Sequence, residues 1–245
     1  MQFHVIYENW EWRAPRGAER VMKTGMIETY PDGPALADAA AQAITDQLVE
    51  ALRTHGRAGL VATGGRSPGP VYDRLATATA FDWTRVVVTL SDERCVPADD
   101  PASNARLVRE RLLKGRGAKA HLLPLWPEPE PAALAALTPF DAVMLGMGED
   151  GHIASLIPGD PGLEDAYATH DLTRPVPAGL GKPPVARITL TLRALANARA
   201  IFLLIAGEAK RGVIGRALAG EDLPVGRLIS QSKAPIRILW TPDGG

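Results

Sequence analysis

Short apolar runs alternate along the chain with longer amphipathic stretches. The runs are rich in branched residues and end in glycine or charged residues, which is typical of strands buried on both faces of a parallel sheet. The pattern predicts strands at residues 58–62, 86–90, 121–125, 142–145, 201–206 and 236–240, with edge strands at 3–7 and 24–29. Residues 187–192 are expected to return to regular structure after a long excursion. Strands that alternate with helices indicate an α/β fold.

Helices are predicted between these strands. The first begins at Pro34, carries apolar residues at helical spacing on one face and ends at Gly56. Ser67 is expected to cap a second helix that begins at Pro68. Further helices are expected at residues 104–113, 131–137 and 208–218. Residues 160–184 are rich in proline, glycine and charge, and we interpret them as a long excursion and a candidate lid.

The order of these elements predicts a single doubly wound domain over residues 1–245. Such a chain forms a mostly parallel sheet with helices on both faces, a Rossmann-like arrangement. No internal repeat and no break in composition divides the sequence. Ligands of such sheets bind beyond the carboxyl ends of the strands, so the polar residues that follow each strand are the candidates for chemistry.

Composition and charge exclude several classes of protein. No apolar run approaches the roughly 20 residues of a membrane span. With 27 basic and 28 acidic residues, the net charge of −1 provides no field for nucleic acid or a membrane surface. The only cysteine, Cys95, excludes an internal disulfide, and the first ten residues lack a secretory signal, so a cytoplasmic protein is expected. No metal site is expected, because the histidines lack ligand spacing: His4, His55, His121, His152 and His170.

The richest candidate site is the segment at residues 146–158, GMGEDGHIASLIP, which follows a predicted strand. It places His152 close in sequence to Asp150 and Glu149, and an imidazole near carboxylates suits acid–base chemistry at neutral pH. The segment also matches the dinucleotide fingerprint G-x-G-x-x-G. Pro158, however, interrupts the helix that this fingerprint requires, and two carboxylates would face the pyrophosphate. His152 is therefore predicted to be a catalytic residue.

Two other strand ends carry groups suited to an anion. The turn Gly64-Gly65-Arg66-Ser67 leads into a helix, whose exposed N–H groups and dipole suit a phosphate, although plain turn chemistry explains it equally well. Lys210 lies in the first turn of its predicted helix, where a cation opposes the helix dipole. Its position suggests an anionic partner, with a solvated lysine as the alternative.

The segment that follows the predicted strand at 86–90 is open to two interpretations. Asp92, Glu93 and Arg94 form either a local ion-pair cluster that stabilises the strand end or a group that orients a ligand or loop. Asn104 and its neighbour Ser103 are expected first as a helix cap and second as ligand contacts. Arg187 resembles Lys210 as a cation near a strand, with a weaker signal.

Together these segments resemble the 6-phosphogluconolactonase family, from about residue 38 to residue 240. The similar motifs lie at residues 64–68, 91–94 with 96–97 and 103–104, 145–156, 187–189 and 207–210. Glucosamine-6-phosphate deaminases, which are related, usually carry Asp-Glu-Tyr where this chain has Asp92-Glu93-Arg94, and this favours the lactonase. Two departures, Ile157 in place of a common phenylalanine and a short segment at 124–131, concern loop shape.

The resemblance implies hydrolysis of 6-phospho-D-glucono-1,5-lactone to 6-phospho-D-gluconate in the oxidative pentose phosphate pathway, with no metal or organic cofactor. His152 is expected to act as general base on a water, oriented by either Asp150 or Glu149. Backbone N–H groups of the Gly64-Gly65 turn or of Gly148 are the candidates for stabilising the oxyanion. The expected substrate and phosphate contacts are Gly64, Gly65, Arg66, Ser67, Asp92, Arg94, Asn104, Gly148, Arg187 and Lys210.

Two other functions are compatible with this architecture. An amino-sugar phosphate deaminase or isomerase would use a carboxylate such as Asp92 to move a proton from carbon. A non-catalytic sugar-phosphate sensor would need a DNA-reading module, for which the residues before Pro34 leave no room. The expected partner is thus a small sugar phosphate lactone, without nucleic acid or membrane, and the expected assembly is a monomer or a weak homodimer.

Overall fold

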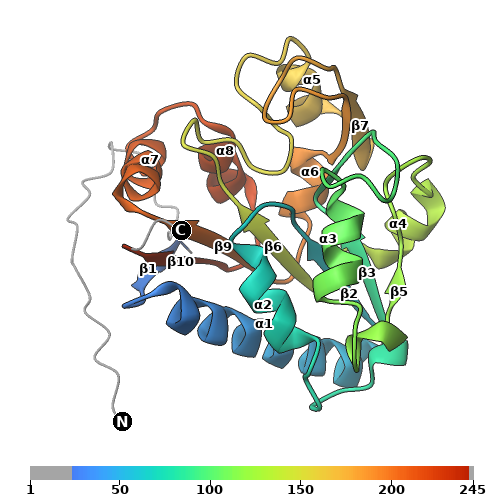
Figure 1. Cartoon of the computed structure of the whole chain (residues 1–245). Helices are drawn as coiled ribbons and strands as arrows, with labels where there is room; N and C mark the ends of the chain where they lie inside the picture. Colours follow the sequence, from blue (N-terminus) through green and yellow to red (C-terminus); the bar gives the residue numbers. More distant parts are fainter. Residues whose placement is uncertain (1–23, 243–245) are drawn as a thin grey trace.

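The computed structural model describes residues 24–242, which are built around a seven-stranded sheet (Figure 1). Across the sheet the strands follow the order β1-β10-β9-β6-β2-β3-β5, and each pairing is parallel. Their bounds in chain order are β1 Thr24–Thr29, β2 Ala58–Ala62, β3 Val86–Leu90, β5 His121–Leu122, β6 Ala142–Gly146, β9 Ile201–Ala206 and β10 Ile236–Thr241. The predicted doubly wound α/β fold is confirmed.

Helices cover both faces of the sheet. In Figure 1, α1 and α2 lie below it, and α6, α7 and α8 lie above. The helices are α1 Gly33–His55, α2 Pro68–Leu75, α3 Asn104–Arg111, α4 Pro131–Leu137, α5 Leu163–Ala168, α6 Leu192–Ala196, α7 Glu208–Leu218 and α8 Pro224–Gln231. The long helix α1 begins as the sequence predicts: Asp32 accepts a hydrogen bond from the Ala35 N–H, and Gly56 ends the helix with a left-handed φ of 75°.

A small antiparallel sheet lies beside the main one and corrects two predictions. Its strands β4 (Asp92–Arg94), β8 (Arg187–Leu190) and β7 (Thr173–Val176) pair in the order β4-β8-β7. The charged tail after β3 is therefore a strand, and the predicted excursion at 160–184 contains both α5 and β7. An ion pair of 2.7 Å between Arg174 Nη1 and Asp160 Oδ2 joins the two ends of the segment around α5.

Two local predictions also need correction. Ser67 does not cap α2: its backbone is already helical, at φ −62° and ψ −35°, and its hydroxyl makes no capping bond. The strand predicted at 121–125 is shorter, because β5 covers only His121–Leu122. The helices α6 and α8 were not predicted. The expected strand at 3–7 lies outside the described residues.

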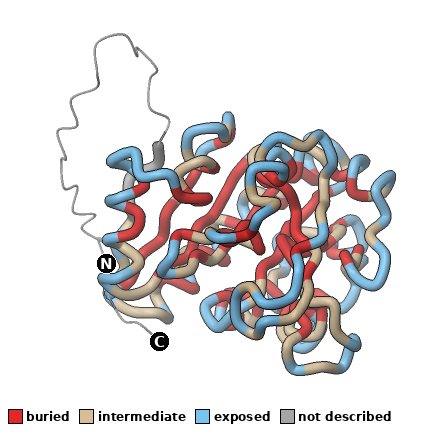
Figure 2. The backbone as a smooth tube through the Cα atoms, turned by 90° about the horizontal axis from the view of Figure 1, so that it is seen from above, coloured by how far each residue is buried: buried red, intermediate tan, exposed pale blue. Residues whose placement is uncertain are grey.

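The core is formed by the central strands together with the inner faces of the helices that cover them. Figure 2 shows these strands as buried stretches surrounded by exposed loops. Starting at β2, the chain adds β3 and β5 on one side, then returns to β6 and continues through β9 to β10 on the other. The winding reverses between the neighbouring strands β2 and β6, and open α/β sheets bind their ligands at such a point, beyond the carboxyl ends of the strands; we call this sheet edge the crevice. The glycine turn at residues 64–67 follows β2. The segment at residues 146–158, which carries His152 and which we call the histidine loop, begins at the end of β6.

Candidate active site

His152 is paired with a carboxylate at the carboxyl end of β6. Its Nδ1 lies 2.6 Å from Asp150 Oδ1, and the same oxygen accepts the His152 backbone N–H at 3.2 Å. The hydrogen bond from His152 lowers the pKa of Asp150, although partial burial opposes the shift. An ionised Asp150 accepts a hydrogen bond from Nδ1–H and leaves Nε2 as the free acceptor of the imidazole. Of the two candidate partners in the sequence, Asp150 is thus the one that contacts the ring.

Gly148 lets the imidazole lie directly against the backbone. A Cβ on this residue would stand 2.2 Å from His152 Nδ1 and 2.4 Å from Asp150 Oδ1. Its N–H donates to the His152 carbonyl at 2.9 Å and so closes the loop. The prediction that the Gly148 N–H stabilises an oxyanion is therefore not supported, because that donor is already used.

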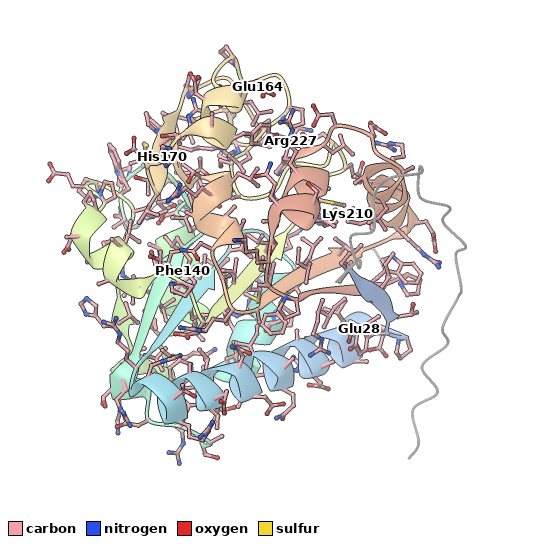
Figure 3. All side chains as sticks on the ribbon, turned by 180° about the vertical axis from the view of Figure 1, so that it is seen from behind. Glu28, Phe140, Glu164, His170, Lys210 and Arg227 are labelled. Atoms are coloured by element: carbon pink, nitrogen blue, oxygen red, sulfur yellow. The ribbon has the colours of Figure 1, made fainter. Side chains whose placement is uncertain are left out.

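Lys210 brings a cation to the same edge of the sheet, in the first turn of α7 after β9. Figure 3 shows it near the end of that strand, on the side of α8. Burial lowers the pKa of Lys210, the negative charge of Glu149 counteracts this, and the positive charge of Arg66 adds to it. Glu149 and Arg66 are thus both within electrostatic reach of Lys210. Two cations that repel each other in this way form a suitable place for a doubly charged anion.

The glycine turn after β2 needs its glycines. Gly65 has a left-handed φ of 98°, and a Cβ on Gly64 would stand 2.0 Å from Asn104 Oδ1. Asn104, the first residue of α3, donates from Nδ2 to the Asp92 carbonyl at 2.8 Å. The structure thus brings together Gly64, Asn104 and Asp92, which are far apart in the chain. Arg66 and Ser67 are exposed at the mouth of this turn.

Three predicted contact residues make hydrogen bonds to protein partners, and two of them are buried. The Arg187 side chain is 4% exposed, and its Nη2 donates to the Pro183 carbonyl at 2.9 Å. The Asp92 carboxylate accepts the Ser155 hydroxyl at 2.6 Å. Arg94, half-buried, donates from Nη1 to the Ala102 carbonyl at 2.5 Å. These partners hold the three side chains beneath the carboxyl ends of the strands, while the buried Nε atoms of Arg94 and Arg187 have no hydrogen-bond partner among the described residues. Their direct contact with substrate stays a prediction.

Glu93, which the sequence left open between a local ion-pair cluster and a group that orients a ligand or loop, is bonded to the start of α3. Its carboxylate accepts the backbone N–H groups of Asn104 and Ala105, both at 2.7 Å, and the Ser103 hydroxyl at 3.1 Å. It therefore neutralises the N-terminus of α3 in addition to Ser103, whose predicted capping bond to the Arg106 N–H is confirmed at 3.1 Å. The sequence signal was the spacing of Glu93 before a Ser-Asn helix start.

Comparison with known proteins identifies the family. The model of the family described as glucosamine-6-phosphate isomerases/6-phosphogluconolactonase matches residues 31–240. The chain belongs to this family. A 6-phosphogluconolactonase of Caulobacter vibrioides is 43% identical over 87% of this chain and 96% of its own length. A 6-phosphogluconolactonase of Pseudomonas putida is 36% identical over 88% of this chain and 93% of its own length. The crystal structure of a 6-phosphogluconolactonase from Shewanella baltica superimposes with a TM-score of 0.81 at 36% identity, covering 90% of this chain and 99% of that one.

In this family member, the histidine loop also packs against the start of α8, a helix that the sequence did not reveal. Gly151 has a φ of 81°, and a Cβ there would meet Leu223 at 3.1 Å. The Gly151 carbonyl accepts the Val225 N–H at 3.1 Å. Arg227 of α8 continues the contact to α5 through an ion pair of 3.3 Å with Glu164, and both side chains lie above the sheet in Figure 3. The histidine loop is thus fixed on two sides.

Other candidate sites on this family member are less developed. A hollow of about 440 Å³ lies where α5, α6 and α8 end, and its cations Arg193 and Lys233 complement the negative ends of these helices. It includes none of the predicted site residues, and we assign it no ligand. Within residues 24–242, no cluster of three or more metal-ligating side chains was found, and no helix has the length and apolarity to span a membrane.

Proposed function

We propose that the protein is a 6-phosphogluconolactonase, which hydrolyses 6-phospho-D-glucono-1,5-lactone to 6-phospho-D-gluconate in the oxidative pentose phosphate pathway. The observation that carries the proposal is the His152–Asp150 pair, 2.6 Å apart, at the same sheet edge as the cation Lys210. Relatives that carry this name cover most of the chain and support it. We expect the enzyme to act in the cytoplasm, as a monomer or a weak homodimer, without a metal or organic cofactor.

In the proposed reaction His152 activates water. Asp150 accepts a hydrogen bond from Nδ1–H and keeps that proton on Nδ1, so Nε2 takes a proton from a water whose oxygen attacks the lactone carbonyl carbon and the ring becomes an imidazolium. The carbonyl electrons move to oxygen and form a tetrahedral oxyanion. When the oxyanion collapses, the bond to the ring oxygen breaks, and the imidazolium returns its proton to that oxygen. The product is an open-chain acid, and His152 is neutral again.

Arg66 and Lys210 are the proposed phosphate contacts. Lys210 is half-buried and Arg66 is exposed, and their mutual repulsion is relieved when a phosphate dianion lies between them. The N–H groups of the Gly64-Gly65 turn lie at the same crevice and remain candidates for a further contact, while Ser67 stays a predicted one. Glu149, with which Lys210 interacts, is proposed to keep the ammonium in place rather than to orient His152.

The buried position of Asp92 argues against an aldose–ketose isomerase or amino-sugar deaminase. Such a reaction requires a carboxylate that reaches a C–H bond of the substrate. Asp92 is 4% exposed, and both carboxylate oxygens already accept hydrogen bonds, from Ser91 at 3.0 Å and Ser155 at 2.6 Å. A carboxylate buried in this way and bonded to protein hydroxyls is shielded from a C–H bond of the substrate.

A direct assay tests the proposal. The purified protein is added to freshly generated 6-phosphogluconolactone, and proton release is followed in weak buffer above the spontaneous rate. Ammonia release from glucosamine 6-phosphate is measured in parallel. Catalysed proton release without ammonia is expected. Ammonia release, or no acceleration of lactone hydrolysis by the folded protein, would overturn the proposal.

Replacement of Lys210 by alanine is expected to raise KM about tenfold with a smaller change in kcat, because one charge-assisted contact to a phosphate is worth about 1.5 kcal/mol or more. The control is Lys119→Ala. Lys119 is exposed and precedes β5, so it lies at the amino ends of the strands. Initial rates over a range of lactone concentrations provide the measurement. An equal KM in the Lys210 variant and the wild type would remove Lys210 from the phosphate site.

The affinity for the stable product 6-phosphogluconate is expected to fall as the pH rises, and at a lower pH than it would if the contact were a lysine with an ordinary pKa. Burial lowers the pKa of Lys210, and Arg66 lowers it further against the opposing effect of Glu149. The cation is therefore lost as pH rises through this lowered pKa. Calorimetric titration between neutral and alkaline pH measures the effect. The Lys210→Arg variant keeps its charge and should retain affinity over this range; identical pH profiles for both proteins would refute the assignment.

A further inference from the structure

The turn that follows His152 is held in an unfavourable backbone conformation. Residues 153–156 form a tight turn, closed by the Leu156 N–H, which donates to the Ile153 carbonyl at 3.0 Å. Its second residue, Ala154, has a φ of +50°, and it is the one non-glycine residue with positive φ in the described part of the chain. Turns with positive φ at this position are dominated by glycine, asparagine and aspartate, because a Cβ is disfavoured there. A strained residue of this kind persists only where its surroundings fix it.

Ser155, the third residue of the turn, supplies that fixation. It is fully buried, and its hydroxyl donates to Asp92 Oδ2 at 2.6 Å. The same hydroxyl accepts Arg187 Nη1 at 3.3 Å, and the Ser155 N–H donates to Thr189 Oγ1 at 3.1 Å. Three contacts from two strands of the small sheet thus converge on one residue of the histidine loop.

Asp92 extends this connection to the glycine turn after β2. The Ser91 hydroxyl joins Asp92 Oδ1, at 3.0 Å, to Thr63 Oγ1, at 3.1 Å. Asn104, which donates to the Asp92 carbonyl, lies where a side chain on Gly64 would be. The loop that carries His152 and the loop proposed to face the phosphate are therefore joined beneath the crevice by one buried carboxylate.

We propose that Ser155 and Asp92 form a positioning pair, which keeps the turn at residues 153–156 closed with Ala154 in its left-handed conformation and thereby directs His152 at the substrate carbonyl. The proposal rests on the proposed function. Neither residue touches the reacting atoms in it. Without the Ser155 hydroxyl, Ala154 relaxes toward negative φ, and the imidazole two residues earlier moves with the backbone.

The test is a double-mutant cycle on this turn. Ser155→Ala is expected to lower kcat per folded protein by about 10- to 100-fold with little change in KM, as for a misplaced catalytic group. Ala154→Gly/Ser155→Ala is expected to recover part of this loss, because glycine adopts positive φ without strain and removes the drive to relax. A role in stability alone predicts no loss of kcat per folded protein in Ser155→Ala, and therefore nothing to recover. Ser155→Cys, with a weak donor of similar size, is the milder variant should Ser155→Ala fail to fold, and an intermediate loss is expected.

The matched control removes a buried hydroxyl elsewhere. Thr191 is fully buried, caps α6 and donates to the Asp171 carbonyl at 2.8 Å, so Thr191→Val should lower stability and leave kcat unchanged. The NMR chemical shifts of the ring protons and carbons of His152, assigned with a His152 variant, provide a readout that does not depend on activity. They should move in Ser155→Ala and not in Thr191→Val. Unchanged His152 signals together with kcat within twofold of wild type would overturn the positioning pair. Absence of lactonase activity in the wild type would instead overturn the proposed function, and the His152 signals would still test the pair.

Discussion

Replacement of His152 by alanine is expected to lower kcat for 6-phosphogluconolactone by about 10² to 10⁴, the usual contribution of a general base. The imidazole Nδ1 lies 2.6 Å from the Asp150 carboxylate. Because this pairing occupies Nδ1, Nε2 is free to accept a proton from water. KM should change little, because the proposed phosphate contacts, Arg66 and Lys210, come from other loops. Binding energy far from the reacting carbon is thus retained while the proton acceptor is lost.

The matched control for His152 is His170→Ala. His170 is an exposed histidine whose Nδ1 lies 2.7 Å from Arg193 Nη1, and Figure 3 shows it well apart from Lys210. Initial rates for both variants, corrected for spontaneous hydrolysis, give kcat and KM separately. A His152 variant with near-wild-type turnover would show that another group activates the water. A large loss in the His170 variant would show that the effect is not specific to the crevice.

The main sheet could be predicted from sequence because its strands bury both faces. Runs such as Ile201–Ala206 carry apolar side chains on every position, and that pattern does not depend on distant partners. β4 could not be predicted in this way. Its residues Asp92 and Glu93 are polar and yet buried, because hydrogen bonds from Ser155, from Ser103 and from the start of α3 satisfy their carboxylates. Only the folded arrangement provides those donors.

In the candidate site, too, some features follow from the local sequence and others depend on the folded arrangement. The residues at the ends of apolar strands, among them His152, Gly64 and Lys210, could be placed at one edge of the sheet from topology alone. Whether a charged residue at that edge faces a ligand or the protein depends on long-range packing. Arg187 and Lys210 look alike in sequence, but β8 pairs with β4 and buries Arg187, whereas the first turn of α7 leaves Lys210 half-buried beside the crevice.

Replacement of Gly148 by alanine is expected to lower kcat by about 10² or more, because a displacement of a catalytic group by about 1 Å can cost that much. The new Cβ would stand 2.2 Å from His152 Nδ1 and 2.4 Å from Asp150 Oδ1, so neither side chain can keep its place. Both sit on a backbone loop closed by the Gly148 N–H, which leaves little room for adjustment. The substitution therefore separates the imidazole from its carboxylate without removing either group.

Gly146→Ala provides the control for this effect. Gly146 is two residues earlier, at the end of β6, and a Cβ there meets no atom within 4 Å. Both variants lose a glycine, so a change in the unfolded chain affects their stabilities alike. Thermal unfolding and kcat are measured on both, and only Gly148→Ala should lose activity while folded. Equal turnover in the two variants would mean that the loop yields to a side chain at 148, and that the contact between Gly148 and the imidazole does not fix the position of His152.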